Sequence, residues 1–156
     1  MEAELVRALV ERWAAAVRAR DVEAVLRSHA ADLLMFDVIG PVAIRGIEEY
    51  KQTWVGQFFP WHGGSGRFDL VDLQVSAGHD VAFATALIDC AGTEDGAMVH
   101  YRLRLTIGLE KHRGEWTVVH EHHSQPLDFD TMRIGGGAAR LAGNRGVETP
   151  APEARS

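Results

Sequence analysis

The fold is most clearly marked near the C-terminal end, in the stretch Gly114-Glu-Trp-Thr-Val-Val-His-Glu-His-His-Ser-Gln-Pro126. Its β-branched and aromatic residues, bounded by a glycine and a proline, predict a strand over residues 115–125. Successive side chains of a strand point to opposite faces. One face would carry the set Trp116, Val118, His120, His122 and Ser124, and the other Thr117, Val119, Glu121, His123 and Gln125.

The strand lies last in a meander. Three other strand-like runs precede it, at residues 67–77, 81–90 and 98–110, and the breaks between them have the length of hairpin turns. A further buried strand is predicted over residues 33–39, where Gly40-Pro41 ends an apolar run.

Helices are predicted before the meander. Apolar residues recur every fourth position from Glu2 to Arg20, which is typical of a long amphipathic helix. Asp21 is a candidate N-cap for a short second helix in which Val22, Val25, Leu26 and His29 share a side. A third helix after Gly46 places on one face the side chains Ile47, Tyr50, Trp54 and Phe58. Helices first and a strand meander last predict an α+β fold with a strongly curved, antiparallel sheet wrapped on helices.

Composition indicates one acidic domain. A chain of 156 residues suits a single domain, and a net charge of −6 argues against nucleic acid or an anionic membrane as partner. No run is apolar enough for a signal peptide or a membrane span, so a cytoplasmic location is expected. Residues 1–132 form the predicted domain, and residues 133–156, rich in Gly, Ala and Pro, form a predicted flexible tail.

Asp37 is the one charge inside an apolar strand. A buried carboxylate must accept hydrogen bonds, pair with a cation or become protonated. It is therefore either a general acid or base in an apolar cavity, or a structural group that bonds amides near Gly40 or pairs with Arg45.

The histidines of the last strand allow several interpretations. His120 and His122 could ligate a metal with a third residue such as His100, could act as acid or base groups, or could hydrogen-bond across strands. Arg104 either contacts an anion or pairs with an acid such as Glu121. The aromatic residues of the third helix either line a cavity or form core; they are Tyr50, Trp54, Phe58, Phe59 and Trp61. Motifs of nucleotide binding and of serine or zinc hydrolysis are absent from the sequence.

Several of these features in order resemble the SnoaL-like, ketosteroid isomerase-like branch of the nuclear transport factor 2-like superfamily. They are the first helix, Arg20-Asp21-Val-Glu-Ala-Val, Leu33-Leu-Met-Phe-Asp37, Gly40-Pro41, Arg45-Gly46 and the stretch Gly114–Pro126. The resemblance covers about residues 2–130. It implies a cone-shaped fold in which three helices pack in a curved, mixed but mainly antiparallel sheet around an apolar pocket, commonly in a homodimer.

The resemblance also assigns residues. The ketosteroid isomerase pattern places its general-base aspartate on Asp37 and turns Val119, Glu121 and His123 toward the pocket. Its oxyanion-binding tyrosine falls on Trp13 and its second oxyanion donor near Leu105 or Thr106, so the donor pair is absent and steroid isomerisation is not expected. The expected pocket lining is Trp13, Tyr50, Trp54, Phe58, Val119 and Leu105.

These observations favour an enzyme acting on a small apolar or carbonyl-containing molecule without a cofactor. Asp37 would accept a proton with His123 or Glu121 as partner, in an isomerisation, cyclisation or dehydration. Two alternatives stay open: a noncatalytic ligand-binding or dimerisation module, and a metal-dependent enzyme built on the His cluster.

Overall fold

The computed structural model describes residues 1–64, 66–130 and 132–134. The helical elements are α1 (Glu2–Ala19), α2 (Val22–Leu26), α3 (Ile47–Gln52), the π-helix η1 (Thr53–Phe58) and α4 (Phe59–His62). The strands are β1 (His29–Phe36), β2 (Ile44–Arg45), β3 (Phe68–Ala77), β4 (Val81–Glu94), β5 (Ala97–His112), β6 (Glu115–Ser124), β7 (Leu127–Asp128) and β8 (Arg133–Ile134).

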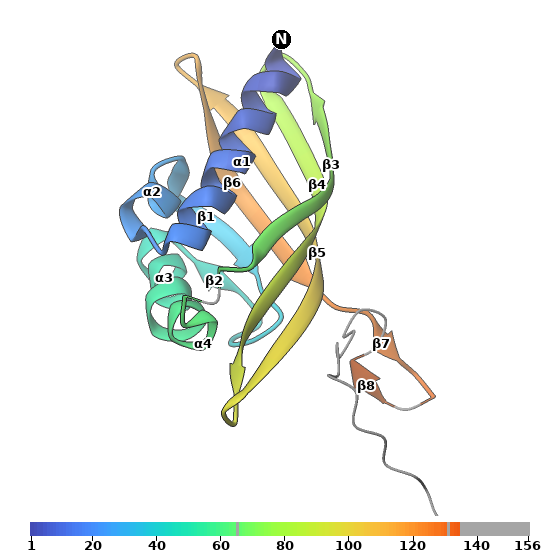
Figure 1. Ribbon diagram of the computed structural model, residues 1–156. Coiled ribbons are helices and arrows are strands. Elements are labelled where there is room, and N and C mark those ends of the chain that lie inside the picture. Colours follow the sequence, from blue (N-terminus) through green and yellow to red (C-terminus); the bar gives the residue numbers. More distant parts are fainter. Residues whose placement is uncertain (65, 131, 135–156) are drawn as a thin grey trace, which may run out of the picture.

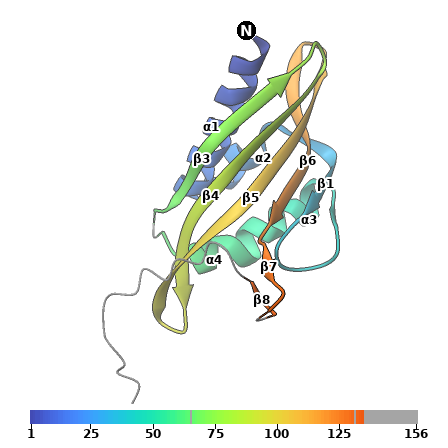
Figure 2. The same ribbon diagram turned by 90° about the vertical axis from the view of Figure 1, so that its right-hand side faces the viewer.

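Six strands form one open, curved sheet in the order β2-β1-β6-β5-β4-β3. All neighbours are antiparallel except β1 and β6, which run parallel. The helices lie along one face of this sheet, and α1 packs across β3 and β4 (Figures 1 and 2). The α+β cone fold with a mixed, mainly antiparallel sheet is therefore confirmed.

Helix α1 packs through the apolar stripe that the sequence predicts. Val6, Val10, Trp13 and Val17 are buried against the sheet. Fully burying a side chain of this kind stabilises the fold by about 1.5–3 kcal/mol. The helix ends where Arg20 adopts a left-handed conformation, φ 56°. Asp21 then caps α2, because its carboxylate accepts a hydrogen bond of 3.1 Å from the backbone N–H of Ala24.

Several boundaries differ from the sequence prediction, among them the end of β4, which reaches Glu94 instead of residue 90. His29 opens β1 rather than continuing the second helix, and β1 ends at Phe36, before the predicted end at Ile39. The third helix continues as η1 and α4 to His62. Pro60 is accommodated there because the first turn of a helix does not need its missing N–H.

A β-bulge interrupts the predicted alternation of β6. Leu109 pairs with Val118 and Gly108 with His120, so one extra residue lies on β6 between the two pairs. Side chains on both sides of the bulge then face the core: Trp116, Val118, Glu121 and His123 are buried. The sequence pattern predicts Val118 on the face opposite Glu121 and His123. This is wrong, because the bulge turns all three side chains to the same buried face.

Near the C-terminal end, β7 and β8 form a separate two-stranded pair. The tail predicted for residues 133–156 lies outside the described residues except for this short strand of Arg133 and Ile134. No helix in the described part of the chain is long and apolar enough to cross a membrane.

Candidate functional site

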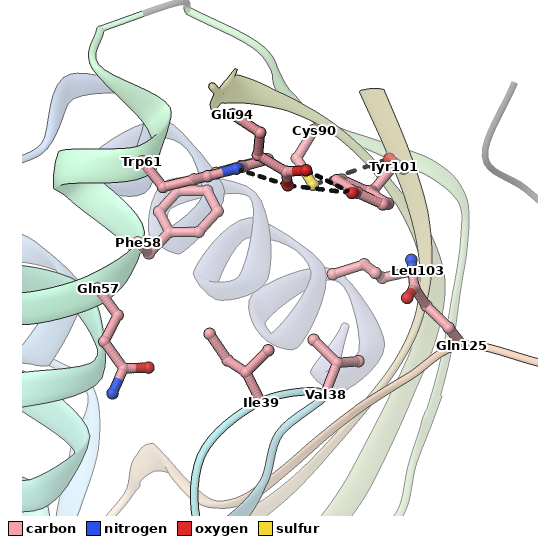
Figure 3. Close-up of a pocket in the computed structure, with 10 residues that line it drawn as sticks. All are labelled: Val38, Ile39, Gln57, Phe58, Trp61, Cys90, Glu94, Tyr101, Leu103 and Gln125. Atoms are coloured by element: carbon pink, nitrogen blue, oxygen red, sulfur yellow. Dashed lines mark hydrogen bonds between the residues drawn. The ribbon is translucent and has the colours of Figure 1, made fainter. Parts of the chain in front are cut away.

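Two adjoining cavities lie between the helical segment α3–η1–α4, the loop after β1 and the sheet. The outer one has a volume of about 280 Å³ and is lined by Val38, Ile39, Gln57, Phe58, Trp61, Cys90, Glu94, Tyr101, Leu103 and Gln125 (Figure 3). The inner one has a volume of about 60 Å³ and is lined by Met35, Asp37, Val38, Ile39, Thr53, Trp54, Phe58, Phe68, Leu103 and His123. The two cavities share Val38, Ile39, Phe58 and Leu103.

Asp37 and His123 supply the ionisable groups of the inner cavity. Asp37 immediately follows β1, and His123 lies on β6, the parallel neighbour of β1, one residue beyond the pair Phe36–His122. This register brings Asp37 Oδ1 to 3.8 Å from His123 Nδ1. Both side chains are largely buried, with 13% and 5% of their surface exposed. Solvent and ligand therefore have only narrow access to this pair.

Glu121 lies directly behind His123 and is fully buried. Its Oε2 is 3.2 Å from His123 Nε2, and its Oε1 is 2.6 Å from His29 Nε2. The hydroxyl of Tyr50 donates a 2.7 Å hydrogen bond to the same Oε1, and the indole N–H of Trp13 donates to that hydroxyl at 3.1 Å. An ionised carboxylate can only accept, so His29 carries a proton on Nε2. Glu121 Oε1 therefore has two hydrogen-bond partners, whereas Oε2 is in ion-pair contact with His123, and the fully buried carboxylate cannot itself contact a ligand.

Burial and the neighbouring imidazoles have opposite effects on the pKa of Glu121. Burial alone would raise the pKa of Glu121, but the His123 and His29 imidazoles overcome that effect and lower the pKa to about 2. Burial also opposes a charged His123, but the Glu121 and Asp37 carboxylates raise the pKa of the imidazole above its usual value. Burial and the Glu121 charge raise the pKa of Tyr50, which keeps its hydroxyl a donor. The result is a buried carboxylate that favours the imidazolium form of His123.

The pKa of the Asp37 carboxyl is raised, whereas that of Glu121 is lowered. Burial raises its pKa, and this effect exceeds the lowering by the His123 imidazole and by the 2.7 Å hydrogen bond from the Val38 N–H to Oδ1. Of the two structural alternatives, the loop amide is present, since the Val38 N–H donates to Asp37. Among the described residues no ion pair joins Asp37 to Arg45, and the imidazole that faces Asp37 is that of His123. A carboxylate with a raised pKa beside an imidazole can exchange protons with a bound molecule.

The predicted lining residues divide into two groups. Trp54 and Phe58 line the inner cavity. Trp13 and Tyr50 instead lie in the core behind it, where Tyr50 donates to Glu121 and Trp13 donates to the Tyr50 hydroxyl. Leu105 is buried, and neither it nor Val119 lines either cavity. For Val119 the reason is the bulge, which turns its neighbour Val118 inward in its place.

The remaining polar candidates are placed away from the cavities. His120 bonds the Leu34 carbonyl through Nδ1 at 2.8 Å, and His122 is exposed. Arg104 donates to the Ser124 hydroxyl at 3.0 Å rather than pairing with Glu121. Within residues 1–64, 66–130 and 132–134, no three His, Cys, Asp or Glu side chains are grouped to hold a metal ion. The metal interpretation therefore has no ligand set in this part of the chain.

Two functional neighbours escaped the sequence prediction. His29 contacts Glu121 across 92 positions of the chain, and Glu94 lies at the outer cavity. Glu121 itself gave a signal for His29, because a carboxylate predicted on the inner face requires a cation or hydrogen-bond donors opposite it. No local pattern marks Glu94, which ends β4 among polar turn residues.

An open, curved sheet around three helical segments, with cavities between them, defines the class of NTF2-like proteins. Within this class, the model of the SnoaL-like domain family matches residues 6–128, and the chain belongs to this family. No curated protein matches the chain.

Solved structures agree with this assignment. An NTF2-like protein of unknown function from Pseudomonas putida KT2440 is 30% identical over 85% of this chain and 92% of its own, with a TM-score of 0.71. A ketosteroid isomerase-like protein from Erwinia carotovora atroseptica is 19% identical over 79% and 95%, with a TM-score of 0.67. The S. rosetta CaMKII hub is 22% identical over 80% and 96%, with a TM-score of 0.66. At identities of 19% and 22%, the likeness to the last two structures concerns the fold alone.

Proposed function

We propose that this protein is a cofactor-independent acid–base enzyme acting on a small, largely apolar molecule that carries a carbonyl group. The observation that supports the proposal most is the Asp37–His123 pair at the inner end of an apolar cavity, with the Glu121 carboxylate behind it. The SnoaL-like fold is compatible with a ligand-binding or isomerase-like domain.

The chemistry assigned to the pair is proton transfer next to the carbonyl. Asp37 accepts a proton from the carbon adjacent to the carbonyl, and its raised pKa makes it a stronger base than an exposed aspartate. The His123 imidazolium donates from Nδ1 to the carbonyl oxygen, where negative charge develops. Glu121 stabilises the imidazolium through Nε2, so it acts on the reaction only through His123. When Asp37 returns its proton to a different carbon and the enol returns its proton to His123, the product is an isomer. When Asp37 instead protonates a hydroxyl on the next carbon, that group leaves as water and the product is dehydrated.

Hydrogen exchange into carbonyl compounds tests this proposal without knowledge of the natural substrate. A panel of small cyclic and aryl ketones in deuterium oxide is followed by NMR for incorporation of deuterium next to the carbonyl. We expect the wild-type protein to accelerate exchange for at least one ketone, and Asp37→Asn and His123→Asn each to abolish the acceleration. Asp69→Asn, an exposed aspartate on β3, is the matched control. Equal exchange by the wild type and Asp37→Asn would refute the proposal.

A second candidate function is assembly. The S. rosetta CaMKII hub shares the fold, and the outer face of β4 exposes Val81 and Phe83, with 61% and 53% of their surface accessible. We propose that this face forms a homodimer and that the protein acts in the cytoplasm. Sedimentation of the wild type and of Phe83→Arg tests the dimer: an arginine there is expected to shift the protein to monomer. A wild-type monomer at high concentration would contradict the proposal.

A further inference from the structure

One end of the outer cavity is closed by a carboxylate, that of Glu94 (Figure 3). Among the ten lining residues, this is the one side chain with a formal charge at neutral pH. The Cys90 thiol stays protonated, since burial raises its pKa to about 12. Most of the other lining residues are apolar, and the polar ones, such as Gln57 and Gln125, are uncharged. The cavity therefore combines an apolar body with a negative end.

Two aromatic side chains hold the Glu94 carboxylate in place. The indole N–H of Trp61 donates to Oε1 at 3.1 Å, and the Tyr101 hydroxyl lies 3.0 Å from Oε1 and 3.1 Å from Oε2. These donors are neutral and leave the negative charge in place. In the described parts of the chain, no lysine or arginine pairs with Glu94.

The same aromatic rings border the space beside the carboxylate. The ring centroids of Trp61 and Tyr101 are 6.0 Å apart with an angle of 42° between the planes. Phe58 lies 5.5 Å from Trp61 and reaches from the outer cavity into the inner one. Electron-rich ring faces attract cations, and most strongly for tryptophan and tyrosine.

Gly92 fixes the position of the Trp61 indole. A Cβ atom at residue 92 would lie 2.2 Å from the indole, so only glycine lets the ring pack flat against β4. The arrangement of Trp61 against Glu94 is thus built into the backbone of the strand rather than being a surface rotamer.

We propose that the outer cavity selects molecules with an apolar body and a protonated amine, with the ammonium group held by Glu94, Trp61 and Tyr101. This inference rests on the proposed function, because it names the substrate class of the same site. The carbonyl end of the molecule enters the inner cavity, and the amine end lies in the outer cavity.

The expected selectivity follows from charge and exposure. An ammonium beside Glu94 gains the attraction of the carboxylate and of the rings, whereas a ligand carboxylate is repelled. Glu94 is exposed to solvent, which weakens both effects. We therefore expect about a tenfold preference for an amine over the matching alcohol, and a larger one over the matching carboxylate.

Three probes that differ only in their polar group test the inference: phenylbutylamine, phenylbutanol and phenylbutyrate, titrated calorimetrically into the full chain. Glu94→Gln should weaken amine binding by about tenfold, leave the alcohol unchanged and strengthen the carboxylate. Glu115→Gln, an exposed glutamate on β6, is the control and should change nothing. The amine preference should also fall as salt concentration rises.

Equal binding of the amine and the carboxylate, or an equal loss of all three probes in Glu94→Gln, would overturn the inference. Asp37→Asn separates it from the proposed function. If Asp37→Asn keeps the amine preference while ketone exchange is absent from the wild type, the substrate class stands and the acid–base proposal fails. If wild-type exchange is present but the probes bind without preference, the substrate class fails alone.

Discussion

Replacing Glu121 with glutamine separates charge from shape at the centre of the buried network. The side chain keeps its size, and its amide oxygen can still accept from the Tyr50 hydroxyl. The negative charge that faces His29 and His123 is lost. We expect the variant to fold with reduced stability and with a His123 that protonates less readily.

The expected loss of stability in Glu121→Gln follows from the pKa of Glu121. Its value falls from the usual 4.5 to about 2 in the folded protein. Each pKa unit corresponds to about 1.4 kcal/mol, so the ionised carboxylate contributes roughly 3 kcal/mol at neutral pH. Removing one partner of a buried ion pair typically costs about 3–5 kcal/mol, which agrees with this figure.

The sign of the pH dependence can be worked out from the two groups. The Glu121 contribution is complete above about pH 4.5 and is lost as the pH falls toward about 2, because its folded pKa is lowered. The pKa of His123 is raised, so its contribution is complete below the usual value of 6.5 and is lost as the pH rises through the folded value. The stability gap between the wild type and Glu121→Gln should therefore be widest between about pH 4.5 and about pH 6.5, and should narrow as the pH rises from there through the folded pKa of His123.

Urea unfolding of the wild type and Glu121→Gln, measured within the pH window of the widest gap and on both sides of it, gives the size of the gap and its pH dependence. NMR titration of the histidine ring measures the His123 pKa. Glu115→Gln on the same strand is the control, because its side chain is exposed. A gap below about 1 kcal/mol, a gap that does not vary with pH, or an unchanged His123 pKa would refute the reasoning.

Three other substitutions have defined outcomes. Gly92→Ala should displace the Trp61 indole and cost about 1–3 kcal/mol in urea unfolding, with a shifted indole N–H resonance; an unmoved resonance would contradict the 2.2 Å approach. Asp21→Ala should lower stability by about 0.5–2 kcal/mol through loss of the α2 cap, and an unchanged unfolding midpoint would argue against that cap. Tyr50→Phe should cost about 1–3 kcal/mol and raise the pKa of Glu121, measured by carbon NMR, because one donor to that carboxylate is removed; a constant pKa would count against the hydrogen bond.

Much of the fold could be predicted because its sequence signals are local. Neighbours within a few residues determine the apolar residue at every fourth position of α1, the Asp21 cap and the hairpin breaks of the meander. The π-helix η1 could not be predicted in this way, since its single extra residue per turn leaves no mark on an apolar pattern already rich in aromatic residues.

The site was harder to predict because its geometry depends on pairing between distant strands. The bulge opposite Gly108 decides which side chains of β6 face inward, and Gly108 belongs to another strand. Trp13 and Tyr50 were expected in the pocket, but Tyr50 donates to Glu121 and Trp13 donates to the Tyr50 hydroxyl, and a single-strand pattern cannot locate these partners. Asp37 and His123 were proposed as partners on the resemblance, and their 3.8 Å separation depends on the parallel register of β1 and β6.

That parallel pairing also bears on the order in which the molecule assembles. Strand β1 lies early in the chain and its neighbour β6 near the end, so His29 meets Glu121 only after a loop of 92 residues closes. Contacts so distant in sequence slow folding, because the closure entropy must be overcome before they stabilise the sheet. On the ribosome, where the N-terminal part emerges first, Asp37 and His29 remain without their ionic partners until the last long strand has been synthesised. The proposed acid–base centre is therefore completed only when the sheet itself is complete.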